Sequence, residues 1–284
     1  MINTKNITNN THRFLLLVLT ALFAGTFSIN AYALPQAMCI YYGQANDKFG
    51  WPYLKDADVI MRSGTNEVAR HHINGSISPG VNFALYVCLD DGSQNESYSD
   101  IALQPGDPVE IYIQDHEGIQ TIIHTNTIPS PEYAGQVITI DVTAGTDSDH
   151  DGMSDAWEQE IVNASTNPAI SSIEDVKPND DYDGDGESNW DEYKSGNFAF
   201  LDYDYLFIEK QTRLANRLQL QLLSVPGKAY TIQSVATLTT NNWQMCTFST
   251  TVDGPLQTGL VEGDGSWLYF YVPYTNRYMR ISVK

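Results

Sequence analysis

The chain has 284 residues and a formal net charge of −20, from 35 acidic and 15 basic side chains. This charge has the wrong sign for binding phosphate, so it argues against nucleic acid and against anionic membranes as partners. The length suffices for two ordinary domains and a linker.

The first 33 residues are typical of an export signal. A region containing Lys5 and Arg13 precedes an apolar run over residues 14–29, and Ala31-Tyr32-Ala33 has the small-x-small pattern of a cleavage site. The run is shorter than the roughly 20 residues that span a bilayer, which disfavours an uncleaved anchor. We therefore expect a signal peptide over 1–33, cleavage after Ala33, no later membrane insertion, and a secreted or cell-surface protein.

The chain contains three cysteines, Cys39, Cys88 and Cys246. Export would expose them to an oxidising compartment, which favours a disulfide between Cys39 and Cys88. However, three is an odd number, and each cysteine lies in an apolar stretch where a buried thiol is common. Both alternatives stand.

Residues 34–145 show short apolar runs separated by Gly, Pro and Asn turn signals, with no helical stretch between them. This pattern predicts an antiparallel β-sandwich domain. The expected strands are residues 38–42, 59–62, 67–73, 82–89, 109–115, 119–125 and 136–142.

Residues 146–197 contain the strongest motif, a twelve-residue acidic loop that occurs twice, at 147–158 and at 181–192. Both copies have oxygen side chains at positions one, three, five and nine, glycine at six and glutamate at twelve. Calcium is a hard cation that takes six to eight oxygen ligands, and this spacing supplies them. The predicted ligands of two Ca²⁺ ions are Asp147, Asp149, Asp151, Met153 through its carbonyl, Asp155 directly or through water, Glu158, Asp181, Asp183, Asp185, Glu187 through its carbonyl, Asn189 and Glu192.

The charge of this region favours the same interpretation. Between residues 147 and 192 there are fifteen acidic side chains and one basic side chain, Lys177, which gives a net charge of −14. The alternative is a disordered, solvated acidic linker. A chance acidic run would not repeat both the glycine and the final glutamate, so the metal interpretation is preferred. Short helices are expected at 156–163 and 190–194, with Trp157 and Trp190 packing the loops together.

The stretches DSDHDGMSDAWE and DYDGDGESNWDEYKSG resemble the dockerin-type and thrombospondin type 3-like calcium repeats of secreted bacterial proteins. The resemblance covers about 50 residues. It implies loop–helix units, calcium as the ion, and a spacer role between extracellular modules. No helical pattern precedes Asp147, and Ser154 and Ser188 replace the aliphatic residue of ordinary EF-hands, so neither a full helix–loop–helix nor sensor-like opening is expected.

Residues 198–284 return to strand patterns, at 217–222, 229–235, 243–248, 267–272 and 278–283. This region resembles a small C-terminal sandwich module of secreted bacterial proteins, which implies fold and location only. In the run 267–272, alternation places Trp267, Tyr269 and Tyr271 on one face. Such a face could bind polysaccharide, although cross-strand aromatic packing is the preferred interpretation.

No catalytic residue is assigned, because no nucleophile, zinc or phosphate-loop motif occurs and the best acidic clusters are assigned to calcium. We expect a mainly β protein with two antiparallel β-sandwich-like domains, joined by a segment with two EF-hand-like calcium loops and short helices. The expected function is non-catalytic calcium binding with a structural or adhesion role, possible partners being a polysaccharide or another surface or matrix protein. The alternative is a carbohydrate-binding or cohesin-recognising accessory protein of a polysaccharide-degrading system.

Overall fold

The computed structural model describes residues 38–90, 99, 101–104, 106–116, 118, 120–127, 135–239, 241–274 and 277–284. The expected signal peptide and its cleavage site lie outside these residues. The described residues are mainly β, with several sheets and two short α-helices. Neither helix is long and apolar enough to cross a membrane.

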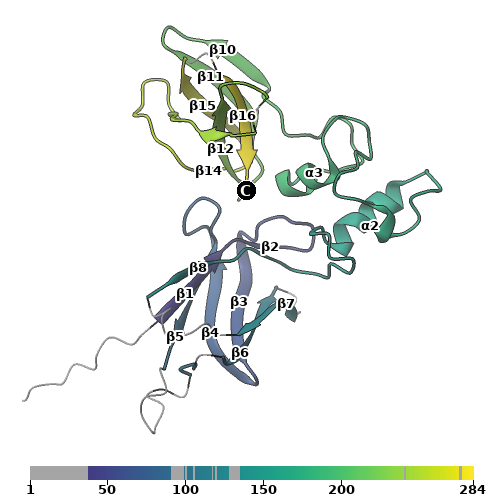
Figure 1. Ribbon diagram of the computed structural model, residues 1–284, viewed down its shortest axis with the longest axis vertical. Helices are drawn as coiled ribbons and strands as arrows, with labels where there is room; N and C mark the ends of the chain where they lie inside the picture. Colours follow the sequence, from purple (N-terminus) through teal and green to yellow (C-terminus); the bar gives the residue numbers. More distant parts are fainter. Residues whose placement is uncertain are drawn as a thin grey trace, which may run out of the picture. The chain divides into compact units, whose positions relative to one another are not determined.

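Residues 38–143 form three sheets, which we call the N-terminal sheets (Figure 1). One has the order β4-β3-β6-β7 and is antiparallel, the second has the order β5-β1-β8, and β2 pairs with β9. Their bounds are β1 Met38–Gly43, β2 Ala45–Asn46, β3 Lys55–Ser63, β4 Asn66–Asn74, β5 Phe83–Cys88, β6 Pro108–Gln114, β7 Gln120–Thr127, β8 Val137–Thr139 and β9 Val142–Thr143.

The core of this region draws alternate residues from both larger sheets. In β1 the buried residues include Cys39 and Tyr41, and β3 and β6 contribute Val59 and Ile111 to the same cluster. This is the period-two pattern expected when one face of each sheet is buried. The alternation expected from the sequence is therefore present here.

Two pairings differ from the expected antiparallel arrangement. The pairs β1 with β8 and β2 with β9 are parallel. Two segments of the chain approach each other closely at Gly43, where an added Cβ would lie 1.9 Å from the carbonyl oxygen of Ile140. Only glycine permits that approach. Strand direction depends on which distant segments meet, and alternation in sequence carries no information about it.

The cysteines are free thiols in this structure. Cys39 is opposite Val87 on the neighbouring strand, and Cys88 is opposite Met38. Neighbouring residues along a strand point to opposite faces, so the two thiols face away from each other across the sheet, a poor geometry for a disulfide. The free-thiol alternative is the one that this register favours.

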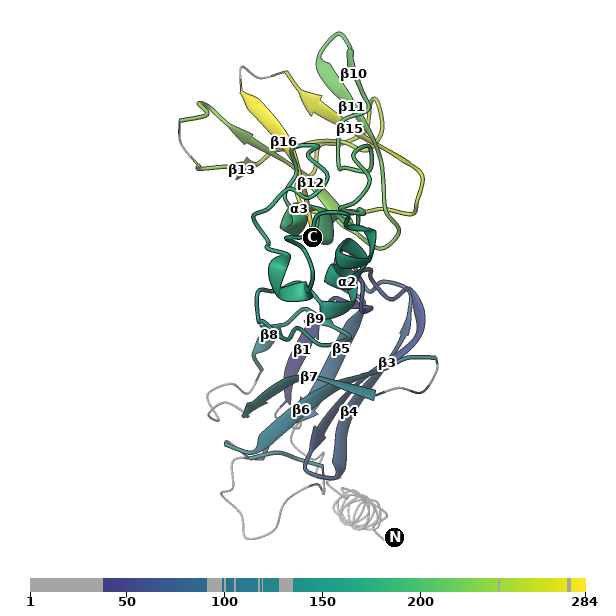
Figure 2. The same cartoon turned by 90° about the vertical axis from the view of Figure 1, so that its right-hand side faces the viewer.

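Residues 210–283 form two further sheets, the C-terminal sheets, of order β10-β11-β15 and β13-β12-β14 with β16 also paired to β12 (Figure 2). Leu220 and Leu222 of β11 are buried against Phe270 of β15, as their alternation with glutamines predicts. The strands are β10 Lys210–Arg213, β11 Arg217–Leu223, β12 Ala229–Val235, β13 Gln244–Met245, β14 Val261–Glu262, β15 Trp267–Pro273 and β16 Tyr278–Val283.

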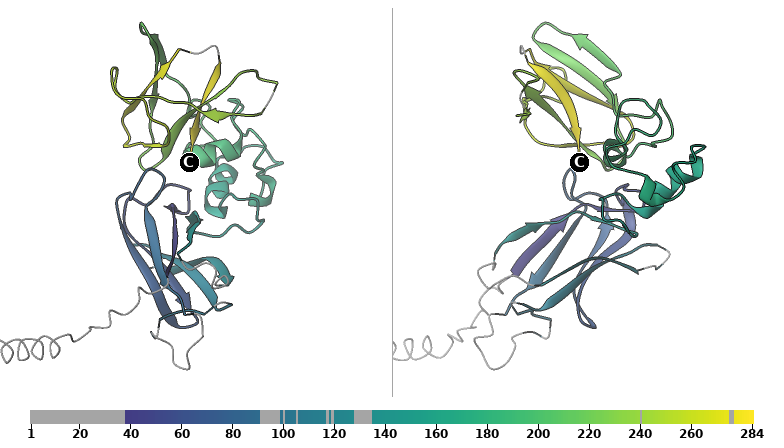
Figure 3. Two further views of the ribbon diagram at one scale, coloured as in Figure 1. Left: turned by 60° about the vertical axis from the view of Figure 1, so that its left-hand side comes forward. Right: turned by 45° about the vertical axis from the view of Figure 1, so that its right-hand side comes forward.

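Between β9 and β10 in the sequence, the chain forms long loops with two helices and one 3-10 turn (Figure 3). The helices are α2 (Asp155–Ala164) and α3 (Asn189–Ser195), and the 3-10 turn is η2 (Ile173–Asp175). Each helix begins at a serine N-cap, because the hydroxyl of Ser154 or Ser188 accepts a hydrogen bond from a backbone amide of the first turn. The helix α3 ends at Gly196, whose φ of 83° is left-handed. These serines therefore fix where each helix starts.

Candidate metal centre

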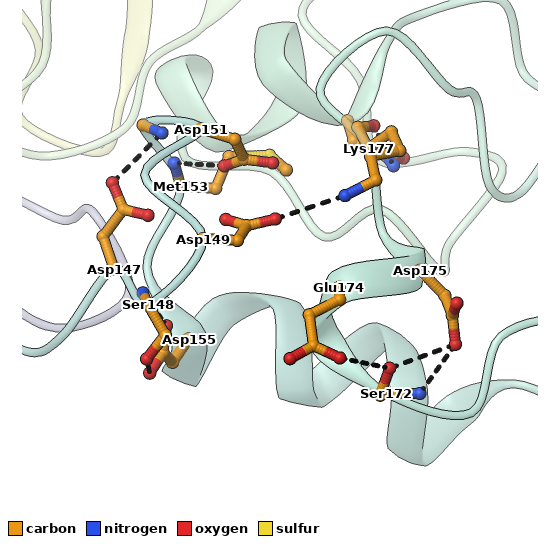
Figure 4. A network of polar contacts seen from close by, with 12 residues as sticks. Asp147, Ser148, Asp149, Asp151, Met153, Asp155, Ser172, Glu174, Asp175 and Lys177 are labelled. Atoms are coloured by element: carbon orange, nitrogen blue, oxygen red, sulfur yellow. Dashed lines mark hydrogen bonds and ion pairs between the residues drawn. The ribbon is translucent and has the colours of Figure 1, made fainter.

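The first acidic loop is held by bonds from its own backbone. The Oδ2 of Asp147 accepts a hydrogen bond from the amide of Gly152 at 3.1 Å, and the Oδ1 of Asp151 accepts one from Met153 at 3.0 Å. Gly152 has a φ of 101°, which glycine adopts without strain. The loop gathers the carboxylates of Asp147, Asp149 and Asp151, whose ligand atoms lie within 4.8 Å of one another (Figure 4).

The second loop repeats this arrangement at the same positions. Asp181 Oδ2 accepts from the amide of Gly186 at 3.0 Å, and Asp185 Oδ1 accepts from Glu187 at 2.8 Å. The ligand atoms of Asp181, Asp183 and Asp185 again lie within 4.8 Å of one another. Both triplets could therefore hold a metal ion, and the repeat in sequence is a repeat in local structure.

A buried glutamate accompanies each triplet. Glu158 on α2 is 0% exposed and Glu192 on α3 is 1% exposed, and neither carboxylate oxygen of either residue has a hydrogen-bond partner. Burial, followed by repulsion from the aspartates of its own loop, raises the pKa of each glutamate to about 8. A protein rarely buries a carboxylate without a compensating partner, because removing it from water is costly.

The unpartnered buried oxygens are concentrated in the two loops. Among the described residues, twelve buried side-chain nitrogen or oxygen atoms have no hydrogen-bond partner, and nine of them are carboxylate oxygens of these loops. Five come from Asp147, Asp149, Asp151 and Glu158, and four from Asp183, Asp185 and Glu192. These oxygens form two sets of acceptors with no donor, which is the chemistry of a cation site.

The ninth residue of each loop, unlike the unpartnered oxygens, has hydrogen-bond partners within its own region of the chain. Both oxygens of Asp155 accept hydrogen bonds, from Ser148 and Thr146, and Figure 4 shows its carboxylate apart from the triplet. Partial burial acts to raise the pKa of Asp155, but these bonds lower it. Asn189 is buried and spans its loop, accepting from the amide of Tyr182 and donating to the carbonyl of Lys177. The predicted ligand roles of Asp155 and Asn189 stay predictions, as do those of the Met153 and Glu187 carbonyls.

The ion pair of Lys177 with the first loop is a feature of the site that the sequence did not reveal. The ammonium nitrogen of Lys177 lies 3.2 Å from Asp149 Oδ2, so the one base between residues 147 and 192 reaches the first triplet (Figure 4). The side chain of Lys177 is half exposed, so this ion pair is weak. It partly neutralises the first loop and would compete with an incoming cation.

Aromatic side chains join the two loops. Trp190 of α3 lies against the first loop, where a Cβ on Gly152 would be 2.9 Å from its ring. Trp157 of α2 makes an edge contact with Tyr193 of α3, with ring centroids 5.4 Å apart. A small core of its own, including Met153, Trp157 and Tyr193, therefore supports both loops. Both tryptophans make the loop-to-loop contacts that the sequence predicts.

The aromatic face of β15 is separate from these loops. Leu268, Phe270 and Val272 belong to the core of the C-terminal sheets, so the alternating residues Trp267, Tyr269 and Tyr271 occupy the other face. Trp267 is 45% exposed, while the two tyrosines are half-buried. Gln221 and Gln219 of β11 are the cross-strand neighbours of Tyr269 and Tyr271. The face combines aromatic rings with amide groups.

Comparison of the sequence with protein families and with curated proteins found no match. The resemblance to calcium repeats therefore depends on the loop residues themselves. These residues form two strongly anionic, all-oxygen clusters, each of which could hold a metal ion.

Proposed function

We propose that this chain is a secreted, non-catalytic calcium-binding protein in which two Ca²⁺ ions, one per loop, order the segment between two β-sandwich modules. The observation that carries the proposal is the set of nine buried, unpartnered carboxylate oxygens. An ion in each loop would satisfy them.

Calcium is the ion that this donor set favours. The gathered ligands are carboxylates, without histidine nitrogen or cysteine sulfur in either triplet, and hard cations prefer such oxygen ligands. A buried terminal glutamate with both oxygens free can bind in bidentate fashion, which suits the seven or eight ligands of calcium better than the six of magnesium. Extracellular modules of this kind bind calcium at about 10⁻⁴–10⁻³ M, so the sites would stay filled outside the cell.

The helices that carry the glutamates contact a loop of the N-terminal region, and this loop is bonded to a residue next to the C-terminal sheets. The hydroxyl of Ser154, at the start of α2, donates to the carbonyl of Lys48 near the N-terminal sheets. The ring of Tyr193 in α3 lies against Gly50, and the carbonyl of Gly50 accepts a 2.9 Å hydrogen bond from Lys228, just before β12. Ions that order the loops would fix α2 and α3, and these contacts would pass that order to both sets of sheets.

Titration calorimetry on chelator-treated protein tests the proposal. Two calcium sites are expected, one removed by Glu158→Gln and the other by Glu192→Gln. Glu160→Gln is a matched control, because Glu160 is an exposed acid on the same helix as Glu158 and lies in neither triplet. Calcium binding that is unchanged in both Glu158→Gln and Glu192→Gln would contradict the assignment.

A second candidate function is polysaccharide binding by the face of β15. It is favoured by the exposure of Trp267 in a row with two tyrosines and beside two glutamines, since aromatic rings can stack on sugars while amides bond to hydroxyls. Retention of the protein on insoluble polysaccharide, abolished by Trp267→Ala, would support this function. Equal retention of the Trp267→Ala variant would exclude this face.

A further inference from the structure

A cavity with mostly aromatic walls lies outside the acidic triplets. Its volume is about 320 Å³, the lower end of the range for small-molecule sites. Its wall is mostly aromatic with a single ionisable side chain. The residues that define it are Phe49, Trp51, Trp157, Phe198, Phe200 and Glu160. We call it the aromatic pocket.

The aromatic pocket has a buried floor and exposed walls. Trp157 is 5% exposed, whereas Trp51 is 40% and Phe198 is 38% exposed. The rings of Trp51 and Phe198 have centroids 5.8 Å apart, and those of Phe198 and Phe200 are 5.6 Å apart, so the walls form one continuous aromatic cluster. Large aromatic side chains exposed together in one cluster are typical of a binding surface.

The electrostatics of the aromatic pocket select a positive ligand. Aromatic faces carry partial negative charge, and the one ionisable residue of the lining is the exposed carboxylate of Glu160. No lysine or arginine lines it, and the whole chain has a net charge of −20. The chain's own Lys48, outside the lining, already places its ammonium 5.2 Å from the centroid of the Phe49 ring. The charge of the lining and of the chain therefore disfavours an anionic ligand.

The apolar wall further restricts the kind of cation. A primary ammonium would lose its water hydrogen bonds on entering and would find few acceptors, since Glu160 is the one charged acceptor of the lining. A quaternary ammonium has no hydrogen to donate, so it enters an aromatic site at lower cost and interacts with several ring faces at once. We propose that the aromatic pocket binds the quaternary ammonium group of a small soluble molecule.

The test is titration of the exported chain with choline in the presence of saturating calcium, followed by calorimetry and by tryptophan fluorescence. The comparison ligand is the neutral isostere of choline, in which a tert-butyl group replaces the trimethylammonium group. We expect saturable choline binding at millimolar concentration, and at least about fivefold weaker binding of the isostere, the factor that a cation–π contribution near 1 kcal/mol gives.

Two variants test separately how the aromatic rings and the negative charge contribute to choline binding. Trp51→Leu keeps an apolar wall but removes a ring face, and Glu160→Gln removes the charge at an exposed position without disturbing the floor. Trp51→Leu is expected to weaken choline binding about fivefold. Glu160→Gln is expected to weaken it about two- to fivefold, because the charge that it removes is exposed to solvent. Trp243→Leu is the control and should leave choline binding unchanged, because Trp243 lies outside the lining of the aromatic pocket. Circular dichroism checks that each variant folds.

Three results would overturn the proposal. The first is no saturable choline binding by the folded, calcium-loaded protein. The second is equal affinity for choline and its neutral isostere, which would make the cavity a plain apolar site. The third is unchanged choline binding in both Trp51→Leu and Glu160→Gln. A failure of calcium binding would appear separately, in the chelator titration, so the two proposals can fail independently.

Discussion

The substitution Glu158→Gln should have opposite effects on stability with and without calcium. Glu158 is fully buried beside the aspartates of its loop, and burial with their repulsion raises its pKa from the ordinary 4.5 to about 8. An acid whose folded pKa is raised destabilises the fold as pH rises from 4.5 to 8. The neutral amide removes this penalty, so in chelator the variant should be more stable than the unsubstituted protein.

The size of both effects follows from simple arithmetic. Each pH unit above 4.5 costs about 1.4 kcal/mol until the folded pKa is reached, so at pH 7 the penalty is at most about 3.5 kcal/mol. In calcium at about a hundred times the dissociation constant, one filled site stabilises the fold by about 2.7 kcal/mol. Because Glu158→Gln removes two of the five free oxygens of the first loop and adds one back, it should lose most of that gain.

Urea unfolding at pH 7, in chelator and in about 10 mM calcium, measures both quantities. The order of stability should invert between the two conditions, with the variant higher in chelator and lower in calcium. Glu160→Gln, an exposed acid on the same helix, should follow the unsubstituted protein in both. If Glu158→Gln is instead equally or less stable in chelator and responds normally to calcium, the buried carboxylate is not an ion ligand and the reasoning is wrong.

Three further predictions concern single side chains. Lys177→Met should tighten calcium binding at the first loop several-fold, measured by calorimetry at low salt, because it removes a competing cation; unchanged affinity would show that the ion pair does not compete. Gly152→Ala should lower the thermal stability of the protein more than Gly186→Ala does. Both glycines have positive φ, but only a Cβ at Gly152 would meet Trp190. Equal losses of stability would mean that this contact contributes nothing. Burial of Lys228 lowers its pKa from 10.5 to about 7, so its penalty on the fold is largest below pH 7 and is relieved as pH rises to 10.5. Relative to Lys228→Met, the free energy of unfolding should therefore increase by up to about 1.4 kcal/mol per pH unit between pH 7 and 10, and identical pH profiles would refute a buried ammonium.

Local sequence patterns predicted local structure well. The alternation in β15 correctly places Leu268 and Phe270 in the core and Trp267 on the other face, because the side-chain period of a strand is two. The spacing of the acidic loops likewise predicted the two aspartate triplets, which a tight turn at a glycine brings together. Such features depend on neighbours within about a dozen residues.

Some features were not predictable from pattern. Asp155 has the spacing of a ligand, yet its oxygens bond to the nearby Ser148 and Thr146 in this structure, because spacing does not distinguish a metal ligand from an acceptor of hydrogen bonds within the loop. Other features depend on distant contacts. The aromatic pocket joins Trp51 to Phe198, residues separated by more than a hundred positions with no shared motif. The parallel pairing of β1 with β8 likewise results from the path of the whole chain.

The contact of Trp190 with Gly152 has a consequence for how the ions would load. Trp190 belongs to the helix that begins at the second loop, yet its ring rests on the turn of the first. An ion that orders either loop would therefore also order part of the structure that supports the other loop. Occupancy should rise more steeply with concentration than two independent sites allow, and the coupling must be equal in both directions.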